Sequence, residues 1–75
     1  MSTHTPPTIG QAMRVGRASR DLTQEALSLR VRCSRQTIMS IENSWSDPGF
    51  HLAVRIARAL GFRLDDVVPN EPIVD

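Results

Sequence analysis

The sequence predicts an all-α protein, a compact domain of five short helices. Apolar residues recur three or four positions apart along most of the chain, which is the spacing of one helix face. No stretch alternates apolar and polar residues like a half-buried strand, and the breaks between the expected helices span only two to four residues. A chain of 75 residues has room for one domain.

The first two helices are expected to begin at capping residues. Thr8 precedes a helix over residues 9–20, and Gln11, three residues after Thr8, completes a capping-box pattern. Thr23 caps a second helix over residues 24–31. Both helices carry apolar side chains on one face, which can therefore point into a core.

The third and fourth helices have similar start and stop signals. Ser34 is the expected cap of a third helix that continues to Asn43. Asp47, followed by a proline, is typical of a cap with proline in the first turn, so a fourth helix is predicted over residues 48–60. Gly61 is suited to ending that helix, whose apolar residues cover a wide arc and predict deep burial.

The two ends of the chain are expected to differ from the domain. A short fifth helix is predicted over residues 64–68, where Pro69 stops it. Residues 1–7 are rich in Thr and Pro and are expected to form a disordered tail. We therefore place the domain at residues 8–68 and an acidic tail at residues 69–75.

The polar face of the third helix is the most informative feature of the sequence. At about 100° per residue, Ile38, Ile41 and Trp45 form a narrow apolar stripe that is expected to face the core. Glu42 lies beside the stripe, so its carboxylate needs a partner from within the fold. Arg and Gln bond bidentately to guanine and adenine edges, so the open face predicts DNA reading. That face carries Arg35, Gln36, Ser40 and Asn43, with Met39 beside them.

Charge is divided unevenly along the chain, although the formal net charge is only +1. Residues 9–45 hold six arginines against three acidic residues, whereas residues 61–75 hold one arginine against four acidic residues. All nine basic residues are arginine, which suits bidentate contacts to phosphate or guanine. The N-terminal half is therefore expected to face a polyanion, and the C-terminal end is not.

The composition argues against several function classes. No apolar run approaches the roughly 18 residues of a membrane span, so no membrane partner and a cytoplasmic location are expected. Cys33 is the single cysteine and is expected to be a small apolar filler. His4 and His51 have no second ligand at a metal-like spacing, and no catalytic constellation is present. We expect no metal, no cofactor and no enzymatic activity.

Two stretches carry a resemblance to a known family. LTQEALSLRVRCSRQTIMSIEN resembles the helix-turn-helix of the Xre family, to which the lambda-type phage repressors and Cro belong. DPGFHLAVRIARALGFRLDDVV is similar to the next part of that family's pattern, so the resemblance covers about residues 9–68. It implies a five-helix lambda-repressor-like domain in a prokaryotic or phage transcriptional regulator. The expected partner is a double-stranded DNA operator, and the expected role is repression, including autoregulation.

The resemblance also implies a role for the polar positions. The third helix would be the recognition helix, with base contacts from Arg35, Gln36, Met39 and Ser40. Contacts to phosphate are expected at Gln24, Arg32, Ser34, Thr37, Asn43 and Trp45. For two of these positions a role other than a phosphate contact stays open: Arg32 can be an exposed residue without a contact, and Trp45 can pack in the core.

Some positions match the family pattern and others depart from it. Glu42 matches a glutamate that commonly pairs with an arginine of the first helix, and Arg17 stands at that place, so a structural salt bridge is implied. Arg32 and Ser44 replace family glycines, and a left-handed conformation at Arg32 costs a non-Gly residue about 1 kcal/mol or more. Gly16 replaces a core leucine of the first helix.

Apolar residues late in the chain suggest a partner surface. We expect a homodimer, since two copies can read two half-sites about 34–36 Å apart. The interface is expected to use the apolar residues Phe62, Leu64, Val67 and Val68, with Ile73 and Val74 beyond them. The acidic end keeps open an alternative function, a protein-binding module such as an antitoxin or accessory subunit with a protein partner.

Overall fold

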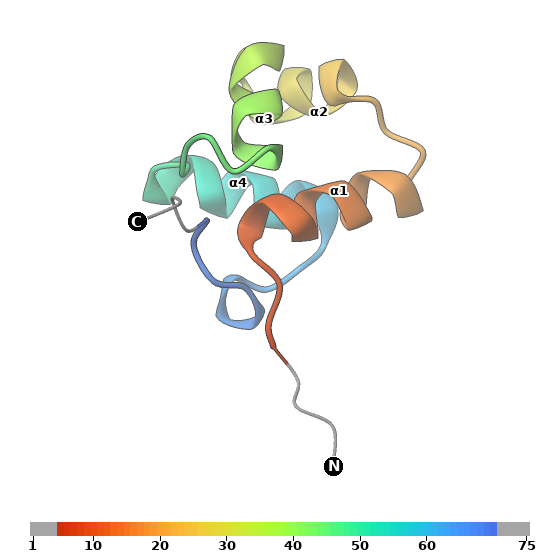
Figure 1. The fold of residues 1–75 in the computed structure, drawn as a ribbon. Helices are drawn as coiled ribbons and strands as arrows, with labels where there is room; N and C mark the ends of the chain where they lie inside the picture. Colours follow the sequence, from red (N-terminus) through yellow and green to blue (C-terminus); the bar gives the residue numbers. More distant parts are fainter. Residues whose placement is uncertain (1–4, 71–75) are drawn as a thin grey trace.

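The computed structural model describes residues 5–70, and these form four α-helices followed by one 3-10 turn (Figure 1). The expected all-α class is confirmed, whereas the expected count of five helices is corrected. Val67 is extended and Val68 precedes a proline, a position where contact with the proline ring disfavours the helical conformation. The elements are α1 Ile9–Ser19, α2 Gln24–Val31, α3 Arg35–Glu42, α4 Phe50–Leu60 and the 3-10 turn η1 Leu64–Asp66.

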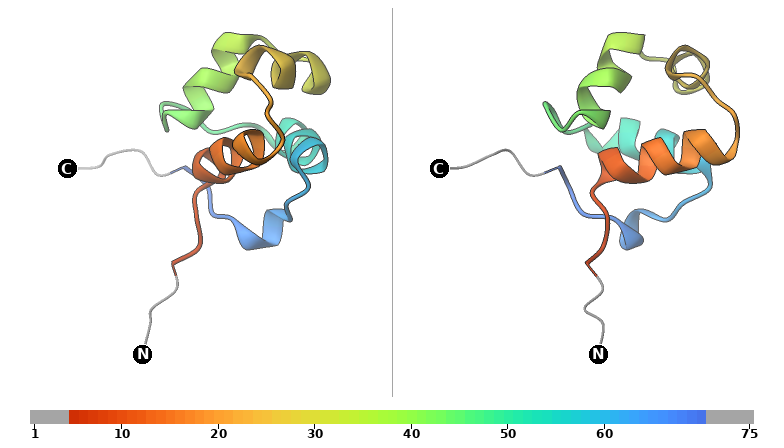
Figure 2. Two further views of the ribbon diagram at one scale, coloured as in Figure 1. Left: turned by 90° about the vertical axis from the view of Figure 1, so that its right-hand side faces the viewer. Right: turned by 45° about the vertical axis from the view of Figure 1, so that its right-hand side comes forward.

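The helices lie in two layers. α2 and α3 cover one side of α1 and α4, and η1 lies on the opposite side (Figures 1 and 2). A contiguous core joins all four α-helices, because each contributes side chains to it. Its buried members are Ile9, Met13, Leu27, Val31, Ile38, Ile41, Ala53, Ile56 and Leu60. No helix among residues 5–70 is both long and apolar enough to cross a membrane.

Three expected N-caps are present. The Thr8 hydroxyl accepts a bond from Gln11 N at 3.2 Å, and the Gln11 side chain accepts from Thr8 N at 2.9 Å, which completes the capping box. Thr23 caps α2 and Ser34 caps α3 in the same way, each through its hydroxyl. These local signals fix where the first three helices begin.

The start of α4 differs from the expectation. Its N-cap is Gly49, without a side-chain hydrogen bond, so the helix begins two residues after Pro48. The carboxylate of Asp47 does not cap the helix because it accepts a hydrogen bond of 2.9 Å from the backbone N of Asn70. A distant partner thus replaces the local one. The helix ends as expected at Gly61, which is left-handed with φ 77°.

Left-handed residues other than glycine mark the connections between helices. Arg32 has φ 60° and ends α2 in the left-handed conformation that a family glycine would adopt at this position. Ser44 has φ 63° and follows α3 directly, while Asp21 has φ 53° between α1 and α2. Because the chain turns at Ser44, the periodicity of α3 stops there. The placement of Trp45 on the core stripe is therefore wrong, and its side chain is 71% exposed.

Gly16 allows α1 to approach α4 closely. A Cβ atom at this position would lie 3.0 Å from Cβ of Leu60, tighter than an ordinary van der Waals contact. Because Gly16 has no side chain, Leu60 of α4 packs directly against α1. Leu60 thus fills the space that a core leucine of α1 would occupy.

The ends of the described chain are tied to the domain. Ile9 N donates to Val68 O at 2.8 Å and Val68 N donates to Pro7 O at 2.9 Å, in an isolated parallel bridge. Asn70 is buried although we assigned it to the tail. The folded domain therefore extends beyond its expected bounds, residues 8 and 68, to include Pro7 and Asn70. Ile73, Val74 and the remaining tail positions lie outside the described residues.

Candidate nucleic-acid interface

The first turn of α3 presents two long polar side chains to solvent. Arg35 and Gln36 are both exposed, and their side chains make no hydrogen bond within residues 5–70. On the inner side of the same helix, Ile38 and Ile41 are buried at 0% and 1% exposure. The amphipathic pattern of α3 thus separates core and open faces as expected. A guanidinium and an amide are free to bond to another molecule.

The hydroxyl groups on α3 are already engaged. Ser34 Oγ accepts from Thr37 N at 3.0 Å and lies 2.8 Å from Thr37 Oγ1. Ser40 Oγ lies 3.0 Å from Oγ of Ser46 in the following loop. These hydroxyls orient the helix start and the loop, and each keeps some bonding capacity for a ligand. Met39 is half-buried beside them and Asn43, the C-cap, is exposed.

A bidentate ion pair fixes α3 against α1. Arg17 Nε lies 2.6 Å from Glu42 Oε2, and Arg17 Nη2 lies 2.9 Å from Glu42 Oε1. The Glu42 side chain is only 2% exposed. Hydrogen bonding to Glu42 raises the pKa of Arg17, partly opposed by burial and assisted by the carboxylate charge. The structure thus contains the salt bridge that the family resemblance implies.

The same carboxylate reaches α2. Gln24 Nε2 donates to Glu42 Oε1 at 3.1 Å, and Arg17 Nη1 donates to the carbonyl of Leu22 at 2.8 Å. Glu42 therefore links three helices. One of the two amide hydrogens of Gln24 points inward, and the other remains for the phosphate contact expected there.

The N-termini of α2 and α3 border a shallow hollow. It measures about 400 Å³ and is lined by Thr23, Gln24, Glu25 and Arg35. Free backbone N–H groups at helix starts and an exposed guanidinium favour an anion, whereas the Glu25 carboxylate opposes one. The geometry suits a phosphate that approaches from the Arg35 side.

Comparison with known families shows to which family the chain belongs. Residues 13–67 match a helix-turn-helix family, which covers more than half of the 75 residues. The chain belongs to this helix-turn-helix family. The Xre-like resemblance is confirmed, and the match spans α2 and α3, to which the sequence resemblance assigns the helix-turn-helix.

Archaeal relatives agree with this assignment. An uncharacterized HTH-type transcriptional regulator of Methanocaldococcus jannaschii is 43% identical over 51 residues, which are 68% of this chain and 77% of the relative. A second, from Methanothermobacter thermautotrophicus, is 49% identical over 65% of this chain and 71% of the relative. A third, from Archaeoglobus fulgidus, is 36% identical over 73% of this chain and 79% of the relative.

Two further side chains of this helix-turn-helix protein lie around the motif. Arg32 is exposed in the turn between α2 and α3. Arg55 of α4 donates from Nε to the carbonyl of Val31 at 2.9 Å and so caps the end of α2. Its capping role carries no local sequence signal, because the two residues are 24 positions apart.

Trp45 lies in the loop that follows α3. Its backbone N–H donates to the carbonyl of Ser40 at 2.9 Å, and its indole is exposed to solvent just beyond α3. The alternative of core packing is excluded by this exposure. The expected contact to the DNA backbone remains a prediction.

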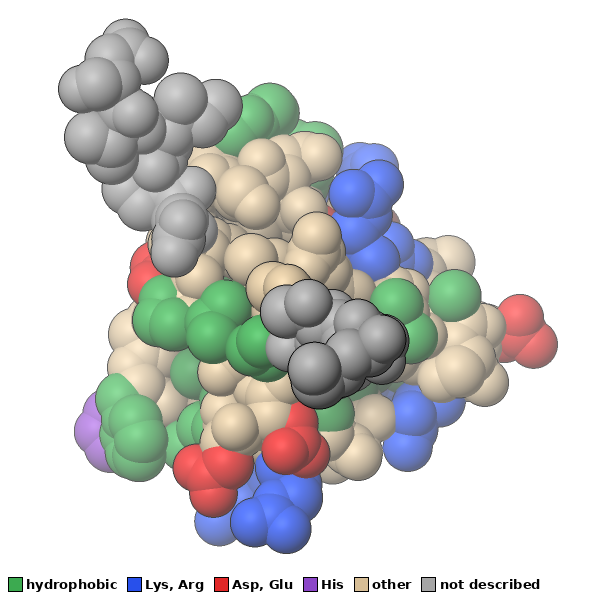
Figure 3. Space-filling view, turned by 60° about the horizontal axis from the view of Figure 1, so that its bottom comes forward, with side chains coloured by type: hydrophobic (Ala, Val, Ile, Leu, Met, Phe, Trp, Pro, Cys, Tyr) green, Lys and Arg blue, Asp and Glu red, His purple; other side chains and the backbone are tan. Residues whose placement is uncertain are grey.

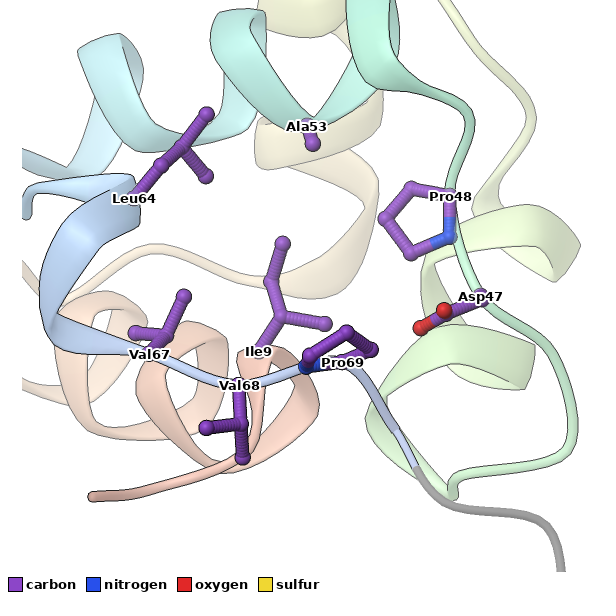
Figure 4. A pocket seen from close by; sticks show the side chains of 8 residues that line it. All are labelled: Ile9, Asp47, Pro48, Ala53, Leu64, Val67, Val68 and Pro69. Atoms are coloured by element: carbon purple, nitrogen blue, oxygen red, sulfur yellow. The ribbon is translucent and has the colours of Figure 1, made fainter.

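The residues expected at a dimer interface lie on the face away from α2 and α3. Phe62, Leu64 and Val67 are half-buried and pack against the core, so they are only partly free. Hydrophobic side chains surround shallow hollows on this face (Figure 3). One hollow of about 150 Å³ is lined by Ile9, Asp47, Pro48, Ala53, Leu64, Val67, Val68 and Pro69 (Figure 4).

Proposed function

We propose that the protein is a sequence-specific DNA-binding regulator of transcription that inserts α3 into the major groove. One observation carries this proposal: Arg35 and Gln36 are exposed and unbonded in the first turn of a helix that Ser34 and Glu42 hold in place. Side chains fixed on a rigid element can discriminate bases, because little conformational freedom is lost on binding.

The contacts divide into two kinds. Arg35 bonds to a guanine and Gln36 to an adenine, while Met39 and Ser40 meet base edges one turn further on. Phosphate contacts position the motif without reading sequence. We assign them to Gln24, Arg32, Ser34, Thr37, Asn43 and Trp45. The hollow between the helix starts, which Gln24 lines together with Arg35, supports a phosphate contact by Gln24.

We further propose that two copies act together as a repressor in the cytoplasm. A dimer reads two half-sites when its twofold axis turns both α3 helices toward one DNA duplex. The partly exposed side chains of Phe62, Leu64, Val67 and Val68 supply the apolar contact. Occupation of a promoter by such a dimer would exclude the polymerase, and the protein's own promoter is the first candidate.

Footprinting over the region upstream of the protein's own gene tests the proposal. We expect a protected, palindromic site, and loss of protection in the Arg35→Ala, Gln36→Ala double variant. Selection of duplexes from a randomised pool provides the same information if the gene is not self-regulated. Failure to bind any duplex at low salt would instead favour the protein-binding alternative.

A further inference from the structure

Asn70 is a buried side chain with every polar atom bonded. It is 6% exposed and follows Pro69 at the end of the described chain. Its Oδ1 accepts from Gly10 N at 3.0 Å, and its Nδ2 donates to the carbonyls of Ile41 and Ser46, each at 2.8 Å. Its backbone N donates to Asp47 Oδ1 at 2.9 Å. One residue thus joins α1, the end of α3 and the loop after α3.

At the helices, the partners of Asn70 are backbone groups of terminal turns. Gly10 N lies in the first turn of α1, and the carbonyl of Ile41 lies in the last turn of α3. Only an amide side chain supplies an acceptor and two donors from one planar group. Asn70 therefore caps two helices at opposite ends.

The other partners of Asn70 hold the loop that carries Trp45. The carbonyl of Ser46 and the carboxylate of Asp47 are both bound to Asn70, on the C-terminal side of Trp45. On the N-terminal side, Ser44 is left-handed and Trp45 N is bonded to Ser40 O. The loop is therefore fixed at both ends. Its residues 44–47 line one hollow together with Asn70.

We propose that Asn70 is a positioning residue of the DNA-binding surface, which holds the loop so that Trp45 contacts the DNA backbone beside the C-terminal end of α3. The inference rests on the proposed function and adds a residue outside the helix-turn-helix to it. The indole N–H is a donor that can bond to a phosphate oxygen. Its 71% exposure within a fixed loop makes it available without a rearrangement.

Trp45 is the only tryptophan and the chain has no tyrosine, so its emission reports on the loop alone. The variants are Asn70→Ala, Asp47→Ala and the control Leu60→Val, which weakens the core at the far end of α4. Circular dichroism at each measuring temperature verifies folding. We expect Asn70→Ala and Asp47→Ala to lower the fluorescence anisotropy of Trp45, and Leu60→Val to leave it unchanged.

A double-variant cycle then connects the loop to DNA. The probe is a short mixed-sequence duplex with an end label, titrated at low salt. Trp45→Ala and Asn70→Ala should each weaken binding about 2- to 10-fold, as for loss of one hydrogen bond. The double variant should bind within about 2-fold of Trp45→Ala alone, because both changes remove the same contact.

Each result decides between distinct conclusions. Unchanged anisotropy in Asn70→Ala, or losses that multiply in the double variant, overturns the positioning role while leaving the proposed function intact. A wild-type protein that binds no duplex overturns both. If Asn70→Ala does not fold, Asp47→Ala takes its place in the cycle, because it removes only the exposed carboxylate that accepts from Asn70 N.

Discussion

Arg17 and Glu42 are joined by two parallel hydrogen bonds of 2.6 and 2.9 Å, between helices 25 residues apart in sequence. The carboxylate also accepts from Gln24, so Glu42 is bonded from two other helices. Burial makes this pair different from a surface salt bridge, since either partner left alone would keep an uncompensated charge.

Glu42→Ala should lower the free energy of unfolding by roughly 3 kcal/mol, because it strands Arg17 and releases Gln24. Arg17→Lys should lower the free energy of unfolding by a smaller amount, since an ammonium group keeps the charge but cannot form the bidentate pair. Urea denaturation measures both. Asp65→Ala is the control, since the Arg63–Asp65 pair is exposed and 3.5 Å long, and we expect no measurable change. An unchanged free energy of unfolding in Glu42→Ala would contradict the role of the pair.

Gly10→Ala should destabilise the protein by about 1–3 kcal/mol, as for overpacking of a buried site. An added Cβ would lie 2.5 Å from the backbone oxygen of Ile41, which cannot move without displacing α3. Gly49→Ala is the matched control, because it has no neighbour within 4 Å and φ −66°. It should cost no more than about 1 kcal/mol, because Gly49 is the N-cap of α4 and Gly is preferred to Ala there. Equal melting temperatures for the two variants would argue against the close contact between α1 and α3.

Arg32→Gly should raise the free energy of unfolding by up to about 1 kcal/mol, since Arg32 adopts φ 60° and ψ 50°. Arg30→Gly, which lies inside α2, should instead lower the free energy of unfolding by about 1 kcal/mol. Calorimetry compares the two. If Arg32 also contacts phosphate, Arg32→Gly will bind DNA more weakly with a shallower salt dependence, despite its greater stability. A destabilised Arg32→Gly variant would show that the side chain holds the turn.

Gln36→Ala should weaken binding to the selected operator by about 1–3 kcal/mol and leave binding to scrambled DNA nearly unchanged. Gln24→Ala should weaken both, because a phosphate contact is independent of sequence. Affinities are measured at one fixed salt concentration. Gln24 also bonds to Glu42, so its variant needs a melting curve beside the titration. An unchanged affinity ratio in Gln36→Ala would refute base reading by that residue.

Local signals determined much of the fold. Thr8, Thr23 and Ser34 each bond to an N–H three residues away, so their capping role depends only on the adjacent chain. The apolar spacing of α3 similarly placed Ile38 and Ile41 in the core and left Arg35 and Gln36 outside. Such short-range geometry follows from the helix period and needs no knowledge of distant partners.

Long-range partners decided the rest, because a side chain with two possible bonds takes the one that the packed chain offers. Asp47 has the sequence of a helix cap but bonds to Asn70, 23 residues away. Asn70 has no local signal at all, since one of its partners, Gly10, lies 60 residues earlier. Trp45 left the core stripe because a turn at Ser44 interrupted the period that the sequence suggested. The sequence determined where the first three helices start and which face of α3 is open, whereas tertiary structure decided where α4 starts and how the loop beside α3 is held.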